Sequence, residues 1–83
     1  MKMHDEIDQR LRMAFQPERL EILNESHKHA GHSGDDGSGE SHFRVLIRAP
    51  KLVAMSRVDR HRAVHAALGD INTRVHALAL DIG

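Results

Sequence analysis

The sequence predicts a single α+β domain, spanning residues 1–83, in which helices cover one face of a three-stranded mixed sheet. A chain of 83 residues has room for only one hydrophobic core. Apolar residues recur at helical spacing in 3–14 and 58–71, whereas 19–25 and 43–49 show patterns typical of strands. With a last apolar stretch at 75–82, the expected order is helix, strand, strand, short helix, helix, strand.

The first helix is amphipathic. Its apolar side consists of Met3, Ile7, Leu11 and Ala14. Acidic residues occupy its first turns and basic residues its later ones, which matches the helix dipole, and Pro17 marks its end. The segment 19–25 then becomes strand-like, because Leu20 and Ile22 fall on one face.

Residues 27–41 are rich in Gly, Ser, Asp and His and form the predicted loop between the first two strands. At about 15 residues the loop is long for a hairpin, and such loops are usually functional or disordered. The strand that follows places Phe43, Val45 and Ile47 on one face, and Pro50 ends it. We expect these two strands to pair as an antiparallel hairpin.

A short helical turn at 51–55 precedes the second full helix, which should end near residues 69–70. Ser56 and Asp59 resemble a capping box with Asp in place of Glu. The apolar stripe of this helix is predicted to contain Val58, His61, Val64, His65, Leu68 and Ile71. The last strand, 75–82, is apolar on both faces, so we expect it to be central or covered on both sides. The helix before it makes a right-handed crossover, which places this strand parallel to its neighbour.

Composition and charge narrow the classes of function. The chain carries 12 basic and 12 acidic side chains, so no global field favours nucleic acid or an acidic membrane. No apolar run approaches the ~20 residues needed to span a bilayer, and the polar segment 1–12 is unlike a secretory signal. Cysteine is absent, which excludes disulfides and CxxC sites, and no catalytic arrangement stands out. We therefore expect a cytoplasmic protein that is not an enzyme.

The chain contains eight histidines, and four of them suggest metal binding. His27, His29 and His32 have H-x-H and H-x-x-H spacing in the loop, and His76 opens the last strand. Neutral imidazole is a borderline ligand suited to Fe, Zn, Cu and Ni. Loop ligands alone bind weakly, since ordering a loop costs about 1–2 kcal/mol per residue, so a ligand on a strand would help. The alternative is that the loop histidines are solvated and that His76 is a packed strand residue.

Four segments, taken in order, resemble the BolA family over nearly the whole chain. They read NESHKHAGH (24–32), SHF (41–43), RHR (60–62) and VHALAL (75–80). BolA-like proteins adopt a KH-like (type II) fold with the order αββααβ. The resemblance therefore implies the same arrangement as the hydrophobic pattern, a three-stranded mixed sheet with helices on one face.

The resemblance also implies a set of metal ligands. In the family the hairpin loop carries the pattern D/N-E-S-x-x-H, and residues 24–29 match it with His29 at the ligand position. The VHALA segment carries the family's invariant histidine, here His76. These two positions would bind one iron of a [2Fe–2S] cluster shared with a monothiol glutaredoxin, while the glutaredoxin cysteine and glutathione bind the other. Such a division of ligands is Rieske-like and raises the reduction potential. His32 and His27 remain alternate loop ligands.

A second class of function, DNA binding, is suggested by the segment 51–69. A short turn followed by a helix gives a helix-turn-helix pattern, and members of the family are also described as DNA-binding transcriptional regulators of the stress and morphology type. The candidate contacts are Lys51, Arg57, Arg60, His61 and Arg62. Against this, arginines on an amphipathic helix mostly form a solvated face, and the pI is about 7.1 rather than above 9. Two functions therefore remain, an adaptor of iron–sulfur cluster trafficking and iron homeostasis that acts with a glutaredoxin, and a DNA-binding regulator.

Overall fold

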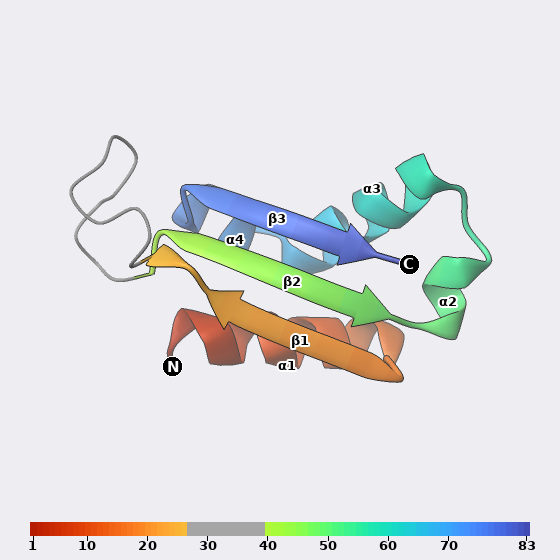
Figure 1. Cartoon of the computed structure of the whole chain (residues 1–83), viewed down its shortest axis with the longest axis horizontal. Coiled ribbons are helices and arrows are strands. Elements are labelled where there is room, and N and C mark those ends of the chain that lie inside the picture. Colours follow the sequence, from red (N-terminus) through yellow and green to blue (C-terminus); the bar gives the residue numbers. More distant parts are fainter. Residues whose placement is uncertain (27–39) are drawn as a thin grey trace.

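The computed structural model describes residues 1–26 and 40–83 (Figure 1). The elements are α1 (Met3–Phe15), β1 (Arg19–Asn24), β2 (His42–Arg48), α2 (Pro50–Val53), α3 (Arg57–Leu68), α4 (Ile71–Arg74) and β3 (Ala77–Ile82). The predicted order is confirmed, with one addition. The short helix α4 lies between the second long helix and the last strand, where the sequence had indicated only the end of a helix.

The three strands form one mixed sheet in the order β1-β2-β3 (Figure 1). β1 pairs antiparallel with β2, and Ile22 lies opposite Val45. β3 pairs parallel with β2 on the other side, and Leu80 lies beside the same Val45. Because β2 is central, its inward side chains Phe43, Val45 and Ile47 are buried. The predicted α+β fold with a mixed sheet is therefore confirmed.

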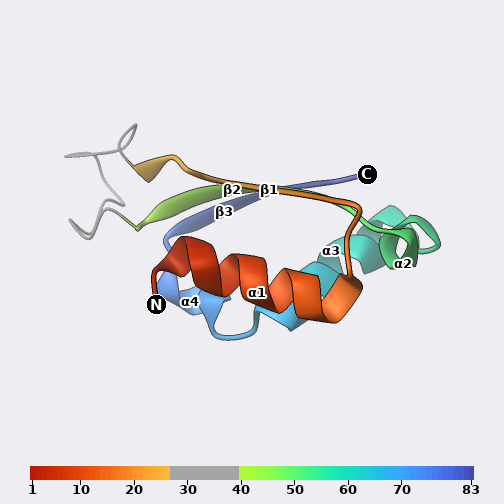
Figure 2. The ribbon, with the colours of Figure 1, turned by 90° about the horizontal axis from the view of Figure 1, so that it is seen from below.

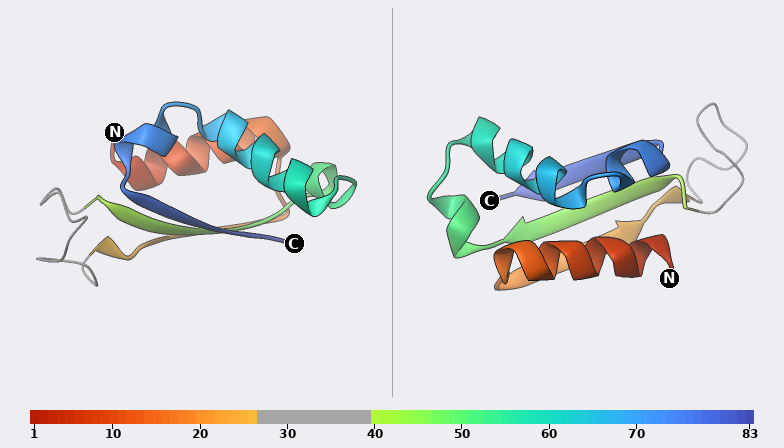
Figure 3. Two further views of the ribbon diagram at one scale, coloured as in Figure 1. Left: turned by 90° about the horizontal axis from the view of Figure 1, so that it is seen from above. Right: turned by 180° about the vertical axis from the view of Figure 1, so that it is seen from behind.

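The helices cover one face of the sheet and leave the other open, as Figures 2 and 3 show. α1 lies under β1 and packs against α3. The core between these layers consists of Met3, Ile7, Leu11, Phe15, Phe43, Val45, Ile47, Ala49, Leu52, Val64, Leu68, Ile71 and Val75. In the described residues no helix is long and apolar enough to cross a bilayer.

The last strand differs from the prediction. We expected a strand over 75–82 that is central or covered on both sides, but β3 begins at Ala77 and forms an edge of the sheet. Leu78 and Leu80 are half-buried against the helices, whereas Ala77 and Ala79 are exposed. Exposure of an alanine costs little because its apolar surface is small. An alternation of alanine and leucine is therefore compatible with a strand that is covered on one face only.

The start of α3 agrees with the capping prediction, but its predicted apolar stripe is only partly right. The Ser56 hydroxyl accepts the backbone N–H of Asp59 at 3.2 Å. Val58 is 58% exposed, and His65 is exposed as well. The residues of α3 that belong to the core or pack against it are Ala63, Val64, Ala67 and Leu68. Small alanines allow close approach to the core, so the buried face of α3 is rotated from the one that the larger side chains indicated.

Candidate functional site

His76 lies between α4 and β3, at the end of the sheet where β1 ends and β2 begins (Figure 1). Its backbone N–H donates to the Ser41 carbonyl at 2.9 Å, and the N–H of Ala77 donates to the same carbonyl at 3.1 Å. The His76 residue is nevertheless exposed. This combination of a fixed backbone and an accessible imidazole suits a ligand that a second protein has to reach.

The ends of the predicted loop are joined next to His76 by a buried serine. The Ser26 hydroxyl accepts the backbone N–H of Ser41 at 2.9 Å and that of His42 at 3.0 Å, and Ser26 is only 3% exposed. The Asn24 side-chain oxygen in turn accepts the N–H of Ser26 at 3.0 Å. We call residues 24–26 and 41–42 the loop neck. It gives the Asn and Ser of the NES triplet a structural role that sequence reasoning had not assigned.

His42 is the histidine that sequence reasoning missed as a neighbour of His76. The centroids of the two rings are 5.2 Å apart, and the ring planes are tilted by 49°. His42 is 8% exposed, and its Nδ1 shares a hydrogen bond of 2.8 Å with the Ser41 hydroxyl. The strand register could have identified His42 as this neighbour, since parallel pairing of residue 42 with residue 77 brings the start of β2 beside the start of β3.

The loop histidines His27, His29 and His32 lie outside the described residues, so their role as ligands stays a prediction. Among residues 1–26 and 40–83, no group of three or more His, Cys, Asp or Glu side chains gathers in a way that could hold a metal ion. His76 therefore offers an accessible imidazole with the His42 ring beside it, but no third donor gathers with them in these ranges. A metal site at His76 would therefore need donors from outside the described residues.

Ion pairs between α1 and α4 support the segment that leads to His76. Arg74 donates to both carboxylate oxygens of Glu6, at 2.9 and 2.7 Å, and to Asp70 at 3.1 Å. Arg10 donates to Asp70 at 2.6 Å. The hydrogen bond from Arg74 lowers the pKa of Glu6, and those from Arg10 and Arg74 lower the pKa of Asp70. α4 is thereby attached to α1 two residues before His76.

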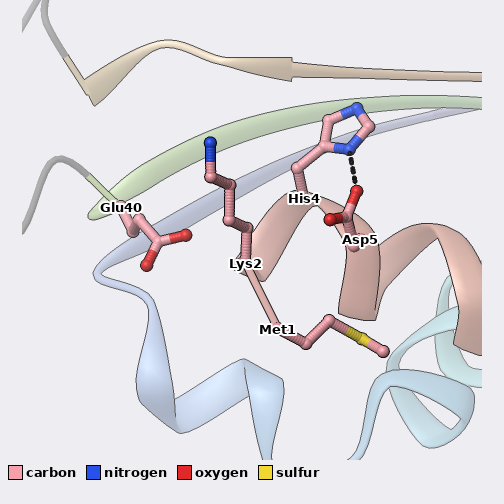
Figure 4. A pocket seen from close by; sticks show the side chains of 5 residues that line it. All are labelled: Met1, Lys2, His4, Asp5 and Glu40. Carbon is pink, nitrogen blue, oxygen red and sulfur yellow. Dashed lines mark hydrogen bonds and ion pairs between the residues drawn. The ribbon is translucent and has the colours of Figure 1, made fainter.

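A second connection to α1 comes from the segment before β2. Glu40 accepts the backbone N–H of Met3 at 2.7 Å and so satisfies a free donor at the start of α1. Figure 4 shows Glu40 across a hollow of about 890 Å³ from the first residues of the chain. The hollow is lined by Met1, Lys2, His4, Asp5 and Glu40. Glu40 affects the site indirectly, because its hydrogen bond holds the start of α1 against the segment that enters the loop neck.

Arg60 connects the two helices of the predicted helix-turn-helix segment. Its Nε donates to the Met55 carbonyl at 3.0 Å, and its Nη2 donates to the Val53 carbonyl at 3.1 Å. Both carbonyls lie at or just after the end of α2, where helices leave acceptors unsatisfied. The half-buried Arg60 side chain thus holds α2 against α3, a structural role that the sequence did not indicate.

The other predicted DNA contacts lie on α2 and α3 with few restraints. The Arg62 side chain is 79% exposed, and Arg57 is also exposed. The Nδ1 of His61 forms a hydrogen bond of 3.0 Å with the Arg57 carbonyl. Lys51 donates to a carbonyl in the last turn of α1 at 3.4 Å. Arg57 and Arg62 are therefore the cations of this segment that are most accessible to a phosphate.

Charges near this segment are largely balanced. A hollow of about 500 Å³ is lined by Arg44, Arg57, His61, Leu80, Asp81 and Ile82. Arg44 pairs with Glu25 at 3.3 Å, and Asp81 pairs with Arg48 at 2.9 Å. Arg57 therefore adds a single exposed positive charge beside paired neighbours. Such a surface attracts phosphates only weakly.

Comparisons with known proteins agree with this fold. Residues 11–82 match the family described as BolA-like protein. An uncharacterized protein in the cobS 5' region of Sinorhizobium sp is 48% identical over 83 residues, which cover 98% of this chain and 89% of that protein. The DNA-binding transcriptional regulator BolA of Escherichia coli (strain K12) is 37% identical over 81 residues, which cover 96% of this chain and 73% of that protein.

A solved structure shows the same fold. The structure of BolA1 from Arabidopsis thaliana superimposes with a TM-score of 0.83 and 32% sequence identity. The match covers 99% of this chain and 90% of that one. The agreement extends over nearly all elements, so the edge position of the last strand belongs to a fold that other proteins share.

Proposed function

Because this chain belongs to the BolA-like protein family, we propose that it is an adaptor that binds a monothiol glutaredoxin and shares a [2Fe–2S] cluster with it. Its role would lie in iron–sulfur cluster assembly and trafficking and in iron homeostasis, by binding and transfer rather than by catalysis. The observation that supports this proposal is His76, an exposed imidazole whose backbone is fixed beside the loop neck.

The donors of this chain fit that role. His76 would bind one iron together with a loop histidine, His29 in the first place and His32 or His27 as alternates. Imidazole is a borderline donor that suits iron, and the chain has no thiolate of its own. The thiolates for the other iron would come from the glutaredoxin and glutathione. A chain without cysteine would thus need its partner to complete the ligand set, so the proposal implies a heterodimer.

Reconstitution of the complex tests the proposal. The chain is mixed with a monothiol glutaredoxin, glutathione, iron and sulfide, and the visible absorption and circular dichroism spectra are recorded. We expect His76→Ala to give the spectrum of an all-thiolate cluster or no cluster, because the strand-proximal imidazole is lost. His65→Ala is the matched control, since His65 is an exposed histidine on α3. A mixed His/Cys spectrum that survives unchanged in His76→Ala would contradict the assignment.

A second candidate function is DNA binding, which is favoured by the similarity to the DNA-binding transcriptional regulator BolA of Escherichia coli. The segment from α2 to α3 would supply the contacts, with Arg57 and Arg62 as the accessible cations. Two exposed arginines in a chain of balanced charge support only weak, salt-sensitive binding, at about micromolar affinity or poorer. Tight binding to a defined duplex at physiological salt would make this function the primary one.

A further inference from the structure

The side chain of His76 is exposed, so its backbone hydrogen bond alone does not fix the direction of its imidazole. A histidine side chain has three staggered χ1 positions, and an exposed ring without a neighbour moves among them. In the structure the ring of His76 lies instead against the ring of His42, with 5.2 Å between the centroids. The structure thus has one direction for the imidazole, with the His42 ring as its neighbour.

His42 is well suited to act as a fixed support. It is 8% exposed, and its backbone N–H is held by the buried Ser26 hydroxyl at 3.0 Å. Its ring is oriented by the hydrogen bond of 2.8 Å to the hydroxyl of Ser41, a residue that is fully buried. The same Ser41 accepts the backbone N–H of His76. The start of β2 thus contacts both the backbone and the ring of His76.

We propose that His42 is a positioning residue for His76, which holds the exposed imidazole in one orientation before a metal and a partner arrive. This inference rests on the proposed function of His76 as a ligand. A ligand that is already oriented loses less freedom when it binds, so its apparent affinity is higher. If His76 sampled three χ1 positions equally, only about one third of the molecules would be competent, and apparent affinity would fall about threefold.

The first test uses the metal-free chain. Three-bond couplings to Cγ report the χ1 distribution of His76, and nuclear Overhauser effects report the contact between the two rings. We expect one χ1 position in the wild-type chain and in His42→Phe, which keeps a planar ring. His42→Ala should show averaging among positions. Thermal unfolding and the amide spectrum establish that each variant is folded, so a structural defect alone would be recognised.

The second test is the reconstitution with glutaredoxin, glutathione, iron and sulfide. At concentrations well below the dissociation constant, where the amount of complex is proportional to apparent affinity, His42→Ala should form about threefold less mixed-ligand cluster, and His42→Phe should restore it. His65→Ala serves again as the control. Loss of the mixed spectrum in His42→Phe to the same extent as in His42→Ala would overturn the positioning role.

The two tests separate this inference from the proposed function. Averaged χ1 couplings of His76 in the wild-type chain, or a single unchanged χ1 position of His76 in folded His42→Ala, would overturn the inference regardless of how much cluster forms. The wild-type measurement is sufficient for this even if His42→Ala does not fold. A mixed spectrum that persists in His76→Ala would instead refute the ligand role of His76, and the ring contact could still be measured.

Discussion

Replacing Ser26 by alanine tests the loop neck most directly. The Ser26 hydroxyl accepts two backbone N–H groups, at 2.9 and 3.0 Å, in a place where Ser26 and Ser41 are buried. Ser26→Ala removes this acceptor and leaves both donors without it. A buried donor that loses its partner costs about 1–3 kcal/mol, which gives about 2–6 kcal/mol for two.

The expected loss lies at the lower end of that range. Water can enter a cavity that is polar and large enough, and the loop neck is close to the surface, where Glu25 and Glu40 are only half-buried. We therefore expect Ser26→Ala to lower the free energy of unfolding by about 2–3 kcal/mol. A domain of this size has about 4–12 kcal/mol in total, and its midpoint temperature would fall by about 10–20 °C.

Urea denaturation followed by far-ultraviolet circular dichroism measures this loss, since the chain has no Trp or Tyr for fluorescence. Ser56→Ala is the matched control, because the Ser56 hydroxyl accepts a single N–H at an exposed helix start. That variant should lose about 1 kcal/mol. If Ser26→Ala is no more destabilising than Ser56→Ala, the argument that the loop neck depends on two buried hydrogen bonds is refuted.

Three further predictions concern the charged side chains. Ion pairs hold the pKa of Glu6 and of Asp70 below their ordinary values of 4.5 and 3.8. Their stabilisation is fully present above those ordinary values and is lost as the pH falls through the lowered ones. Glu6→Gln should therefore be less stable than wild type near pH 7, and the difference should disappear as the pH falls through the lowered pKa of Glu6. Denaturation curves at several pH values measure this, and a difference that persists in acid would contradict it. In gel-shift or anisotropy titrations, replacing Arg57 and Arg62 by alanine should abolish weak duplex binding without loss of stability. Arg60→Ala should instead lower stability by about 1 kcal/mol, because it removes hydrogen bonds between α2 and α3, and equal stability of Arg60→Ala and wild type would count against this role.

Features that depend on nearby residues could be predicted from the sequence. The limits of α1 follow from apolar spacing and from Pro17, and the start of α3 follows from Ser56 and Asp59. The antiparallel pairing of β1 and β2 follows from two alternating segments joined by one loop. Each of these signals lies within a few residues or in one hairpin, where periodicity and capping act directly.

Only part of the candidate site could be predicted from the sequence. Residue type and family resemblance indicated His76, but neither indicated that His42 lies against it or that Ser26 joins the two ends of the loop. Those contacts join residues 34 and 15 positions apart in the chain. The edge position of β3 was hidden for the same reason. The bonds from Arg60 span only five and seven positions, and they were hidden because they depend on how α2 packs against α3.

The sequence by itself determined the strands, the helices other than α4 and the order of these elements, because they depend on local spacing of apolar residues and on a few capping and breaking residues. Only the tertiary structure decided that β3 is an edge strand, that His42 lies against His76 and that Arg60 holds two helices together. These features depend on strand register and on how helices pack over the sheet. A pattern of residue types carries little information about either, since one pattern is compatible with several packings.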